Sequence, residues 1–193
     1  MRRGIAIAAG LLLTFSCAFA QKTFKSSDLS IKKGPSERIA AKNRDNCFFV
    51  VCKTAPEHLS VYEVIGRDTV KLAEYPACMG KNKGHKQKSG DMKTPESGKV
   101  PFKISQIQDA SSWRHDFGDG RGNILSYGHW FMRLDTRGFK GIGIHGSTNN
   151  ESSVPGRASE GCIRLLDKDI IHLHDNYARV GTPVYILHEG ETD

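Results

Sequence analysis

His145 and Cys162 are the residues of this 193-residue chain whose types and spacing could carry out chemistry, and they lie 17 positions apart. A thiol is a strong nucleophile only as a thiolate, so a catalytic cysteine needs a base beside it, and an imidazole suits that role. Gly146 lets the chain turn after His145, and Gly161 lets the backbone approach a substrate carbonyl. The N–H groups of Gly161 and Cys162 could then face an oxyanion. The pattern predicts cysteine-based acyl transfer; the alternative is a buried structural cysteine and a core histidine.

The segments around these two residues carry a family resemblance. His145 lies in Gly-Ile-Gly-Ile-His-Gly, and Cys162 lies in Ser-Glu-Gly-Cys-Ile-Arg-Leu. Together they resemble the signature of the L,D-transpeptidase catalytic domain family, the YkuD-like family, in which an Ile-His-Gly strand end precedes a Ser/Thr-His-Gly-Cys-(apolar)-Arg/Asn block. Residues 90–98 resemble that family's Asp-x-x-Thr-Pro-Glu-Gly turn, with Ser97 inserted, and residues 180–186 resemble its closing Val-Gly-Thr-Pro-Val strand.

The resemblance implies a mainly β, β-sandwich-like fold with one substantial helix, and an enzyme of peptidoglycan metabolism. His145 would take the proton of Cys162, and the thiolate would attack the carbonyl that joins the third residue of a stem peptide to its terminal D-alanine. An amine of a neighbouring stem would convert the thioester into a 3-3 cross-link. Water in its place would make the protein an L,D-carboxypeptidase, and a non-catalytic peptidoglycan-binding protein is the third alternative. The resemblance implies no cofactor, and a carbapenem would acylate Cys162.

Glu160 departs from the family, which has histidine immediately before Gly-Cys. A carboxylate beside a thiol disfavours the thiolate by like-charge repulsion, whereas an imidazole does not. We expect Glu160 either to point into solvent or to pair with a cation, Arg157 or Arg164. Because His145 and Cys162 are both retained, the enzyme interpretation stands.

Substrate contacts are expected around the same segment. Arg164 lies two residues past the nucleophile, and its forked, permanently charged guanidinium suits a stem carboxylate. The alternative is a structural ion pair with Asp167 or Asp169. The resemblance also places Ser159, Gly146, Trp130 and Tyr127 among the substrate-binding residues, the last two in an aromatic strand expected at residues 127–134.

Residues 1–20 indicate a secretory signal peptide, because two arginines precede an apolar run and Ala-Phe-Ala ends the segment. This predicts a periplasmic or cell-envelope location for the mature chain. An uncleaved membrane anchor would need about 20 apolar residues, more than this run has. Cys17 raises the alternative of a lipoprotein, which the bulky Phe15 disfavours.

The rest of the chain predicts one domain behind a basic extension. Residues 21–44 carry seven Lys/Arg against two Asp/Glu, whereas residues 45–193 carry nineteen of each sign. The extension is either a solvated tether or a segment attracted to anionic envelope polymers. Residues 45–188 form the expected catalytic domain, and residues 189–193 form a tail. We expect the mature chain to be a monomer. No motif predicts nucleic-acid binding, and no second stretch of membrane-spanning length occurs.

Short apolar runs predict most of the regular structure. Strands are expected at residues 48–51, 102–104, 131–134 and 141–145, and a turn at residues 66–68 predicts a hairpin. Residues 81–99 predict a loop rich in glycine and lysine. One helix is expected after Asp167, which could cap it, with His172 and His174 on its flanks. Its apolar face consists of Ile170, Leu173 and Tyr177.

Four cysteines remain beyond the signal segment. Cys162 must stay free to act as a nucleophile. Cys47 and Cys52 are too close along one strand to form a disulfide, because five extended residues span about 16 Å and bridged Cα atoms lie within about 7 Å. We expect buried free thiols at Cys47, Cys52 and Cys78, and a Cys52–Cys78 disulfide is the alternative. No zinc site is expected from Cys162, His145, His172 and His174, because no metal-binding spacing is present.

Overall fold

The computed structural model describes residues 44–193, so the expectations for the signal segment, for Cys17 and for nearly all of the extension lie outside the described residues. The described part is mainly β with one α-helix, as expected. Its elements are, in chain order, η2 (Arg44–Asn46), β1 (Cys47–Cys52), β2 (His58–Ile65), β3 (Asp68–Pro76), β4 (Cys78–Gly80), β5 (Phe102–Asp109), β6 (Arg114–Asp116), β7 (Asn123–Leu125), β8 (Trp130–Asp135), β9 (Gly143–His145), η3 (Glu151–Ser153), β10 (Gly156–Ser159), β11 (Ile163–Arg164), α1 (Asp167–Asn176) and β12 (Pro183–Ile186).

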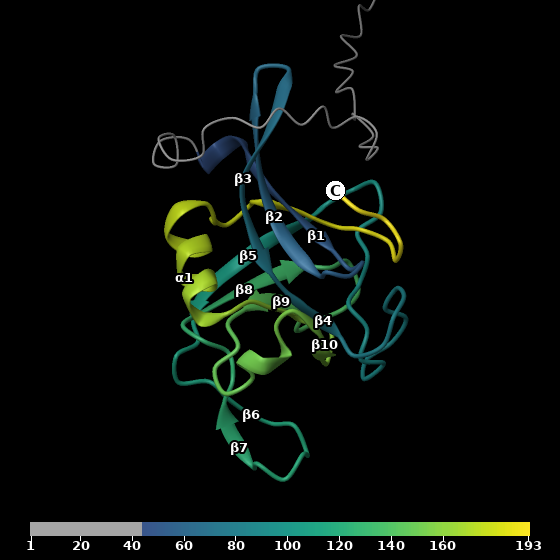
Figure 1. The fold of residues 1–193 in the computed structure, drawn as a ribbon, viewed down its shortest axis with the longest axis vertical. Helices are drawn as coiled ribbons and strands as arrows, with labels where there is room; N and C mark the ends of the chain where they lie inside the picture. The colour runs from purple at the N-terminus through teal and green to yellow at the C-terminus, as the bar shows by residue number, and fades with distance from the viewer. Residues whose placement is uncertain (1–43) are drawn as a thin grey trace, which may run out of the picture.

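Ten of these strands form one sheet, in the order β10-β4-β11-β9-β8-β5-β12-β1-β2-β3, and β6 and β7 form a separate hairpin at one end of the molecule (Figure 1). Most neighbours are antiparallel, but β9 runs parallel to β11. Parallel neighbours need a long connection, because the chain must return to the same end of the sheet. Between β9 and β11 that connection is residues 146–162, which end at the cysteine.

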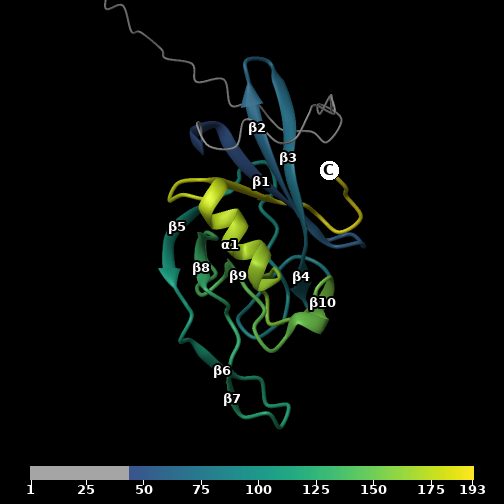
Figure 2. The ribbon, with the colours of Figure 1, turned by 60° about the vertical axis from the view of Figure 1, so that its left-hand side comes forward.

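The two ends of the sheet fold toward each other around one apolar core. Phe49 of β1 lies in the same buried cluster as Ile144 of β9 and Ile163 of β11, although these strands are far apart in the sheet order. Helix α1 lies against β8 and β9 (Figure 2) and adds Ile170 and Leu173 to the cluster. Each such fully buried side chain contributes about 1.5–3 kcal/mol of hydrophobic free energy. This shared core gives the β-sandwich-like arrangement that the sequence predicts.

Seven strands confirm the sequence-based expectations, and five short strands do not follow from them. β1, β5, β8 and β9 lie where apolar runs predict strands, β12 lies where the family resemblance implies the closing strand, and β2 and β3 form the expected hairpin. β4, β6, β7, β10 and β11 were not predicted. They have two to four residues each, too few to show an alternating pattern.

The helix confirms its predicted apolar face and corrects its predicted cap. The residues Ile170, Leu173 and Tyr177 are all buried. Asp167 is the first helical residue, and Leu166 takes the N-cap position without a side-chain hydrogen bond. The Asp167 carboxylate instead accepts hydrogen bonds from the Ser147 N–H at 2.7 Å and from the Thr148 hydroxyl. It therefore fixes the turn that follows His145, and it was wrong to expect it as a cap.

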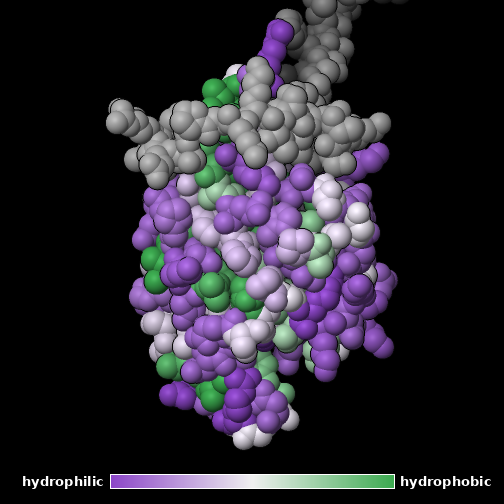
Figure 3. Space-filling model, in the orientation of Figure 1, coloured by the Kyte–Doolittle hydropathy of each residue, from purple (hydrophilic) through white to green (hydrophobic). Residues whose placement is uncertain are grey.

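The surface and the remaining cysteines complete the picture of the described residues. Hydrophilic residues cover most of the face in Figure 3, and hydrophobic residues gather there in small separate groups. Cys47, Cys52 and Cys78 are buried, as expected, and form no disulfide within residues 44–193. Within residues 44–193, no helix has both the length and the apolar character needed to cross a membrane.

Candidate active site

The parallel pairing of β9 and β11 brings His145 and Cys162 together. His145 is the last residue of β9, and Cys162 directly precedes β11. In this pair Ile163 lies opposite Ile144, and Arg164 lies opposite His145. The side chains of His145, Cys162 and Arg164 line one small pocket. The fold thus places the base, the thiol and the arginine of the sequence prediction around a common space.

The backbone before the thiol needs glycine at position 161. Gly161 has a φ of +131°, and a Cβ there would lie 2.7 Å from the carbonyl oxygen of Lys93. Ser159 holds this turn, because its hydroxyl donates to the Cys162 carbonyl at 2.6 Å and accepts from the Gly161 N–H at 3.1 Å. The Gly161 N–H therefore already has a partner. The Cys162 N–H is the oxyanion donor that this turn offers.

The His145 imidazole is buried and held in one orientation. Its Nδ1 lies 2.7 Å from the carbonyl oxygen of Gly146, which can only accept, so Nδ1 carries the proton and Nε2 carries the lone pair. The ring packs against both Tyr127 and Phe131, with centroid distances of 4.8 and 5.6 Å. Burial lowers the pKa of His145 to about 3, and the charge of Arg164 acts in the same direction. The imidazole is therefore neutral at neutral pH and can accept a proton.

The Cys162 thiol is half-buried and donates a hydrogen bond to the carbonyl oxygen of Gly141 at 3.4 Å. Desolvation raises the pKa of the thiol, and the Glu160 carboxylate adds to this rise. The charges of Arg164 and Lys86 lower the same pKa. Without a ligand, the protein therefore holds a neutral thiol and a neutral imidazole. The hydrogen bond to Gly141 has to break before the thiol proton can pass to the imidazole.

Arg164 is a buried cation that forms no ion pair with any residue of the described part of the chain. Its side chain is almost fully enclosed, and its Nε atom has no hydrogen-bond partner there. The guanidinium lies 5.0 Å from the centre of the Phe117 ring. The ion pair considered with Asp167 or Asp169 is not formed. Burying an uncompensated charge costs several kcal/mol, so the fold keeps a cation that is suited to an incoming carboxylate.

The β6–β7 hairpin contributes two residues that the sequence did not single out. His115 of β6 lines the catalytic pocket, and its Nε2 lies 3.4 Å from a carboxylate oxygen of Glu160. Glu160 thus pairs with a histidine of the hairpin. Neither of the arginines that we considered, Arg157 and Arg164, takes this position. Phe117 directly follows β6, and its ring packs against the His115 ring at a centroid distance of 4.5 Å.

A polar groove of about 420 Å³ adjoins the catalytic pocket. It shares four lining residues with the pocket, namely Phe117, Ser159, Glu160 and Arg164. Beyond these it is lined by charges of both signs, Lys81, Arg121 and Asp119 among them. Such a groove suits a ligand that carries both carboxylates and amines.

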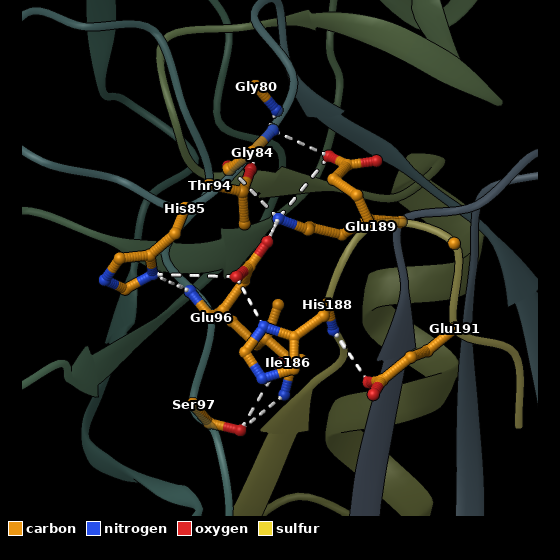
Figure 4. Close-up of polar contacts among 12 residues, drawn as sticks. Gly80, Gly84, His85, Thr94, Glu96, Ser97, Ile186, His188, Glu189 and Glu191 are labelled. Atoms are coloured by element: carbon orange, nitrogen blue, oxygen red, sulfur yellow. Dashed lines mark hydrogen bonds and ion pairs between the residues drawn. The ribbon is translucent and has the colours of Figure 1, made fainter.

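A second group of charged side chains, most of them buried, contacts residues 81–99, and Figure 4 shows its members Glu96, His188 and Glu189; we call it the Lys53 cluster. It consists of Lys53, Glu96, His188, Glu189 and Arg157. Lys53 has no exposed side-chain surface, forms an ion pair with Glu96 and lies 3.5 Å from Glu189. Glu96 also contacts His188 at 2.7 Å, and Glu189 contacts Arg157 at 2.8 Å. Each charge in this cluster faces an opposite one.

The Lys53 cluster has a structural consequence for the catalytic turn. It holds the two ends of the loop, because Lys53 contacts the Gly84 carbonyl at 3.2 Å and Glu96 at its far end. Between these ends, the Lys93 carbonyl lies directly against Gly161. At the start of the loop, the Lys81 N–H donates to the Ser159 carbonyl at 2.8 Å. The loop thus forms a fixed wall behind the thiol.

The side chains of Cys52, His58 and Asp193 form a group with the composition of a metal site. The two ring nitrogens of His58 are already engaged, with the Pro56 carbonyl at 2.7 Å and with Asp193 at 2.6 Å. The Cys52 thiol donates to the Glu191 carbonyl at 3.4 Å. Because these atoms satisfy one another, the group is an anchor that packs residues 189–193 onto β2, and its donors do not fit a metal.

The structure separates several other residues that the sequence analysis considered. Trp130, expected at the substrate site, packs on His174 of α1 with ring centroids 3.8 Å apart, and it does not line the pocket around Cys162. His172 contacts the Tyr75 hydroxyl at 2.7 Å. The two helix histidines thus have partners outside the pocket, and the four residues weighed for zinc do not come together.

The remaining predicted substrate residues lie at the site in different ways. Tyr127 and Ser159 line the pocket. Gly146 lies behind it, and its N–H donates to the Tyr127 carbonyl at 2.8 Å. A Cβ on Gly146 would lie 2.7 Å from the Cα of Gly128. The structure thus gives Gly146 a packing role in this place.

Three residues near the thiol were missed by sequence reasoning: His115, Phe117 and Lys86. The glycine-rich residues 118–122 directly after Phe117 are a turn signal that could have predicted the hairpin. No local signal shows that this hairpin folds over the cysteine. Lys86 gave no signal, because it is one of six lysines in its loop.

Comparison with known proteins identifies the family of the chain. The family model of the L,D-transpeptidase catalytic domain, YkuD, matches residues 49–186. No match was found among curated proteins.

Solved structures show the same fold at low sequence identity. Bd1075 of Bdellovibrio bacteriovorus is 21% identical with a TM-score of 0.53, and the match covers 75% of this chain and 48% of that one. An L,D-transpeptidase from Mycobacterium smegmatis is 19% identical with a TM-score of 0.50, covering 73% and 59%. The helical cell shape determining protein Pgp2 of Campylobacter jejuni is 20% identical with a TM-score of 0.50, covering 76% and 50%. The chain thus spans about half the length of these proteins.

Proposed function

The chain belongs to the L,D-transpeptidase catalytic domain family, and we propose that it is a peptidoglycan L,D-transpeptidase with Cys162 as nucleophile and His145 as base. One observation carries this proposal: Cys162, His145 and Arg164 line the same pocket, and Arg164 has no ion-pair partner in residues 44–193. A thiol, a neutral imidazole and a free guanidinium are the groups needed to cleave an amide next to a terminal carboxylate.

In the first half-reaction the stem peptide is the acyl donor. Nε2 of His145 takes the thiol proton as the sulfur of Cys162 attacks the carbonyl that precedes the terminal D-alanine. The Cys162 N–H faces the resulting oxyanion. When the C–N bond breaks, the imidazolium returns the proton to the leaving amine, so D-alanine departs and a thioester remains. The lowered pKa of His145 favours this return, because a weakly basic imidazole gives up its proton readily.

In the second half-reaction an amine of a neighbouring stem attacks the thioester. His145 takes a proton from this amine, and the Cys162 sulfur leaves and is reprotonated. The product is a 3-3 cross-link, and the enzyme returns to its starting state. Water in place of the amine gives a tripeptide, which is the L,D-carboxypeptidase outcome.

Arg164 is the residue that we propose for recognition of a stem carboxylate. Its guanidinium lies in the pocket and also lines the groove, so a carboxylate in the groove can reach it. Bound there, the carboxylate would neutralise the charge that helps to lower the pKa of His145. Donor binding would therefore make His145 a better base at the moment when the base is needed.

The test is incubation of the purified protein with disaccharide tetrapeptide, followed by mass analysis of the products. Cross-linked dimers that accumulate with loss of D-alanine support the transpeptidase. Tripeptides alone indicate the L,D-carboxypeptidase, and unchanged substrate with measurable binding indicates a binding protein. A Cys162→Ala variant is the matched control and should give no product.

A carbapenem gives an independent test of the nucleophile. Its strained ring presents an activated carbonyl, so intact-mass analysis should show one adduct, and peptide mapping should place it on Cys162. Absence of an adduct after prolonged incubation would contradict an accessible, reactive thiol.

The proposed substrate requires an extracytoplasmic location. We propose that residues 1–20 direct secretion to the periplasm or cell envelope and that the basic residues 21–44 form a tether there. The mature chain would act as a monomer. One structural neighbour, Pgp2, is named a determinant of helical cell shape. Cell shape is therefore a phenotype to measure in a strain that lacks this protein.

A further inference from the structure

The β6–β7 hairpin contacts the catalytic region through a small number of side chains. It pairs only with itself, because its two strands form a separate sheet. His115 contacts Glu160 at 3.4 Å, and Phe117 lies over the Arg164 guanidinium at 5.0 Å. In the loop of the hairpin, Arg121 donates to the carbonyl oxygen of Asn149 at 2.7 Å. The His115 contact is the one that joins the hairpin to the turn containing the nucleophile.

The His115–Glu160 contact lies among the charged groups that surround the thiol. Glu160 and Arg164 come from the two sides of the cysteine, and Lys86 comes from residues 81–99. His145 lies in the same pocket, and His115 acts on the pKa of its ring in the lowering direction. Tyr127 packs against the His115 ring at a centroid distance of 6.3 Å. Glu160 is the one anion in this set that faces the thiol, and it faces His115 too.

The Nε2 atom of His115 is buried but makes no hydrogen bond within the described part of the chain. At 3.4 Å its contact with Glu160 is electrostatic, and it gains strength when the imidazole carries a proton. A buried polar atom without a hydrogen bond costs free energy, so a contact of this kind persists when something else favours it. Compensation of the Glu160 charge is the favourable interaction that offsets this cost.

We propose that His115 is a positioning residue of the active site, and that its imidazole offsets the Glu160 carboxylate beside Cys162 while it holds the β6–β7 hairpin over the pocket. In this chain Glu160 occupies the position next to Gly-Cys. The second imidazole near the thiol therefore comes from His115, in the distant β6–β7 hairpin. This inference rests on the proposed function only in taking Cys162 as the nucleophile.

A double-mutant cycle on the full chain tests this inference. The variants are His115→Gln, Glu160→Gln and the combination of both. The measurement is the pH profile of iodoacetamide labelling of Cys162, read at that site by mass spectrometry. His129→Gln and Glu74→Gln are matched controls, because both residues are exposed and lie outside the pocket. Thermal unfolding of each variant shows that it is folded.

His115→Gln should slow labelling at pH 7 by about three- to tenfold, because an uncompensated carboxylate raises the thiol pKa by up to about one unit. Glu160→Gln should speed labelling by a similar factor. In the Glu160→Gln background, His115→Gln should have little effect, because no charge remains for it to offset. Hydrogen exchange of residues 114–125 should rise in His115→Gln.

Equal effects of His115→Gln in both backgrounds would overturn the proposal, and so would a labelling profile that matches the wild type. Labelling reads the thiol without any peptidoglycan, so it separates this inference from the proposed function. Coupling in the cycle without turnover of tetrapeptide would reject the transpeptidase and keep the role of His115. Turnover without coupling would do the reverse.

Discussion

The catalytic pocket and the Lys53 cluster both contain buried charged side chains. These charges form ion pairs in the Lys53 cluster, whereas the buried cation of the pocket does not. In the Lys53 cluster each cation has an anion within ion-pair distance, and Figure 4 shows two of these anions, Glu96 and Glu189. In the pocket, Arg164 has no ion-pair partner in residues 44–193, and buried polar atoms of Ser126 and His115 make no hydrogen bond there. The charges of the Lys53 cluster are paired within the described part of the chain, although the Nε atom of Arg157 makes no hydrogen bond there, whereas the Arg164 guanidinium remains available to pair with a ligand.

This difference separates a structural role from a functional one. Buried polar groups are normally paired, because an unpaired one costs about 1–3 kcal/mol. A fold retains such a cost where another molecule supplies the partner. The Lys53 cluster fixes residues 81–99, whose Lys93 carbonyl backs Gly161. The paired region therefore supports the unpaired one, and substitutions in the two should affect different properties.

Replacement of the nucleophile should have the largest effect. Cys162→Ala should reduce turnover of tetrapeptide by at least about 10³-fold, because no other thiol lines the pocket. Circular dichroism and the unfolding midpoint should stay close to those of the wild type. Cys47→Ala is the matched control, since Cys47 is buried away from the site and its loss should leave turnover intact. Turnover near the wild-type level in Cys162→Ala would reject the thioester mechanism.

Stability should distinguish the two regions directly. Lys53→Met should lower the free energy of unfolding by about 3–5 kcal/mol, because it leaves Glu96 buried and without its cation. Arg164→Met should lower it by less than about 1 kcal/mol, or raise it, because it removes a buried charge that has no counter-ion. Urea unfolding at pH 7 gives both values. Equal losses in the two variants would contradict the comparison.

Activity should depend on the guanidinium of Arg164. Arg164→Lys keeps the charge but loses the forked guanidinium, so we expect kcat/KM for tetrapeptide to fall about 10- to 100-fold, mainly through KM. A donor amidated at its terminal carboxyl is the matched substrate. Wild type and variant should differ little on it, because the group that Arg164 binds has been removed. An unchanged ratio between the two substrates would show that Arg164 contacts something else.

Local sequence patterns predicted the features of the structure that depend mainly on neighbouring residues in the chain. The apolar runs of β1, β5 and β8 predicted their strands, and the spacing of Ile170 and Leu173 predicted the buried face of α1. The pairing of His145 with Cys162 followed from the two glycine-containing segments and their family resemblance. In these places the type of a residue and of its sequence neighbours is enough to predict the local structure.

Local sequence patterns could not predict contacts between segments that are far apart in the sequence. The partner of Glu160 lies 45 positions earlier, in a hairpin with strands of three residues. The partner of the Asp167 carboxylate is a turn 20 positions earlier, and this long-range bond replaced the local cap that the sequence favours. Lys53 and Glu96 are 43 positions apart, and they come together because β12 pairs with β1 and also accepts a hydrogen bond from Ser97. Such contacts depend on the complete topology.

The smallest expected effect concerns acid, and it tests whether the Lys53 cluster is paired by charge. Desolvation opposes ionisation of Glu96, but hydrogen bonds from Lys53 and His188 outweigh it and lower the pKa of Glu96. A lowered folded-state pKa adds stability above the unfolded-state pKa of about 4.5, and this stability is lost as pH falls through the folded value.

Glu96→Gln should therefore be less stable than the wild type at pH 7, and the difference should shrink steadily between about pH 5 and pH 3. Asp91 and Asp193 also have lowered pKa values, but they titrate in both proteins, so the difference isolates Glu96. Urea midpoints across this range give the measurement. A difference that is constant with pH would mean that the Glu96 carboxylate contributes through its shape and packing, and the Lys53 cluster would then be held together without a net contribution from its charges.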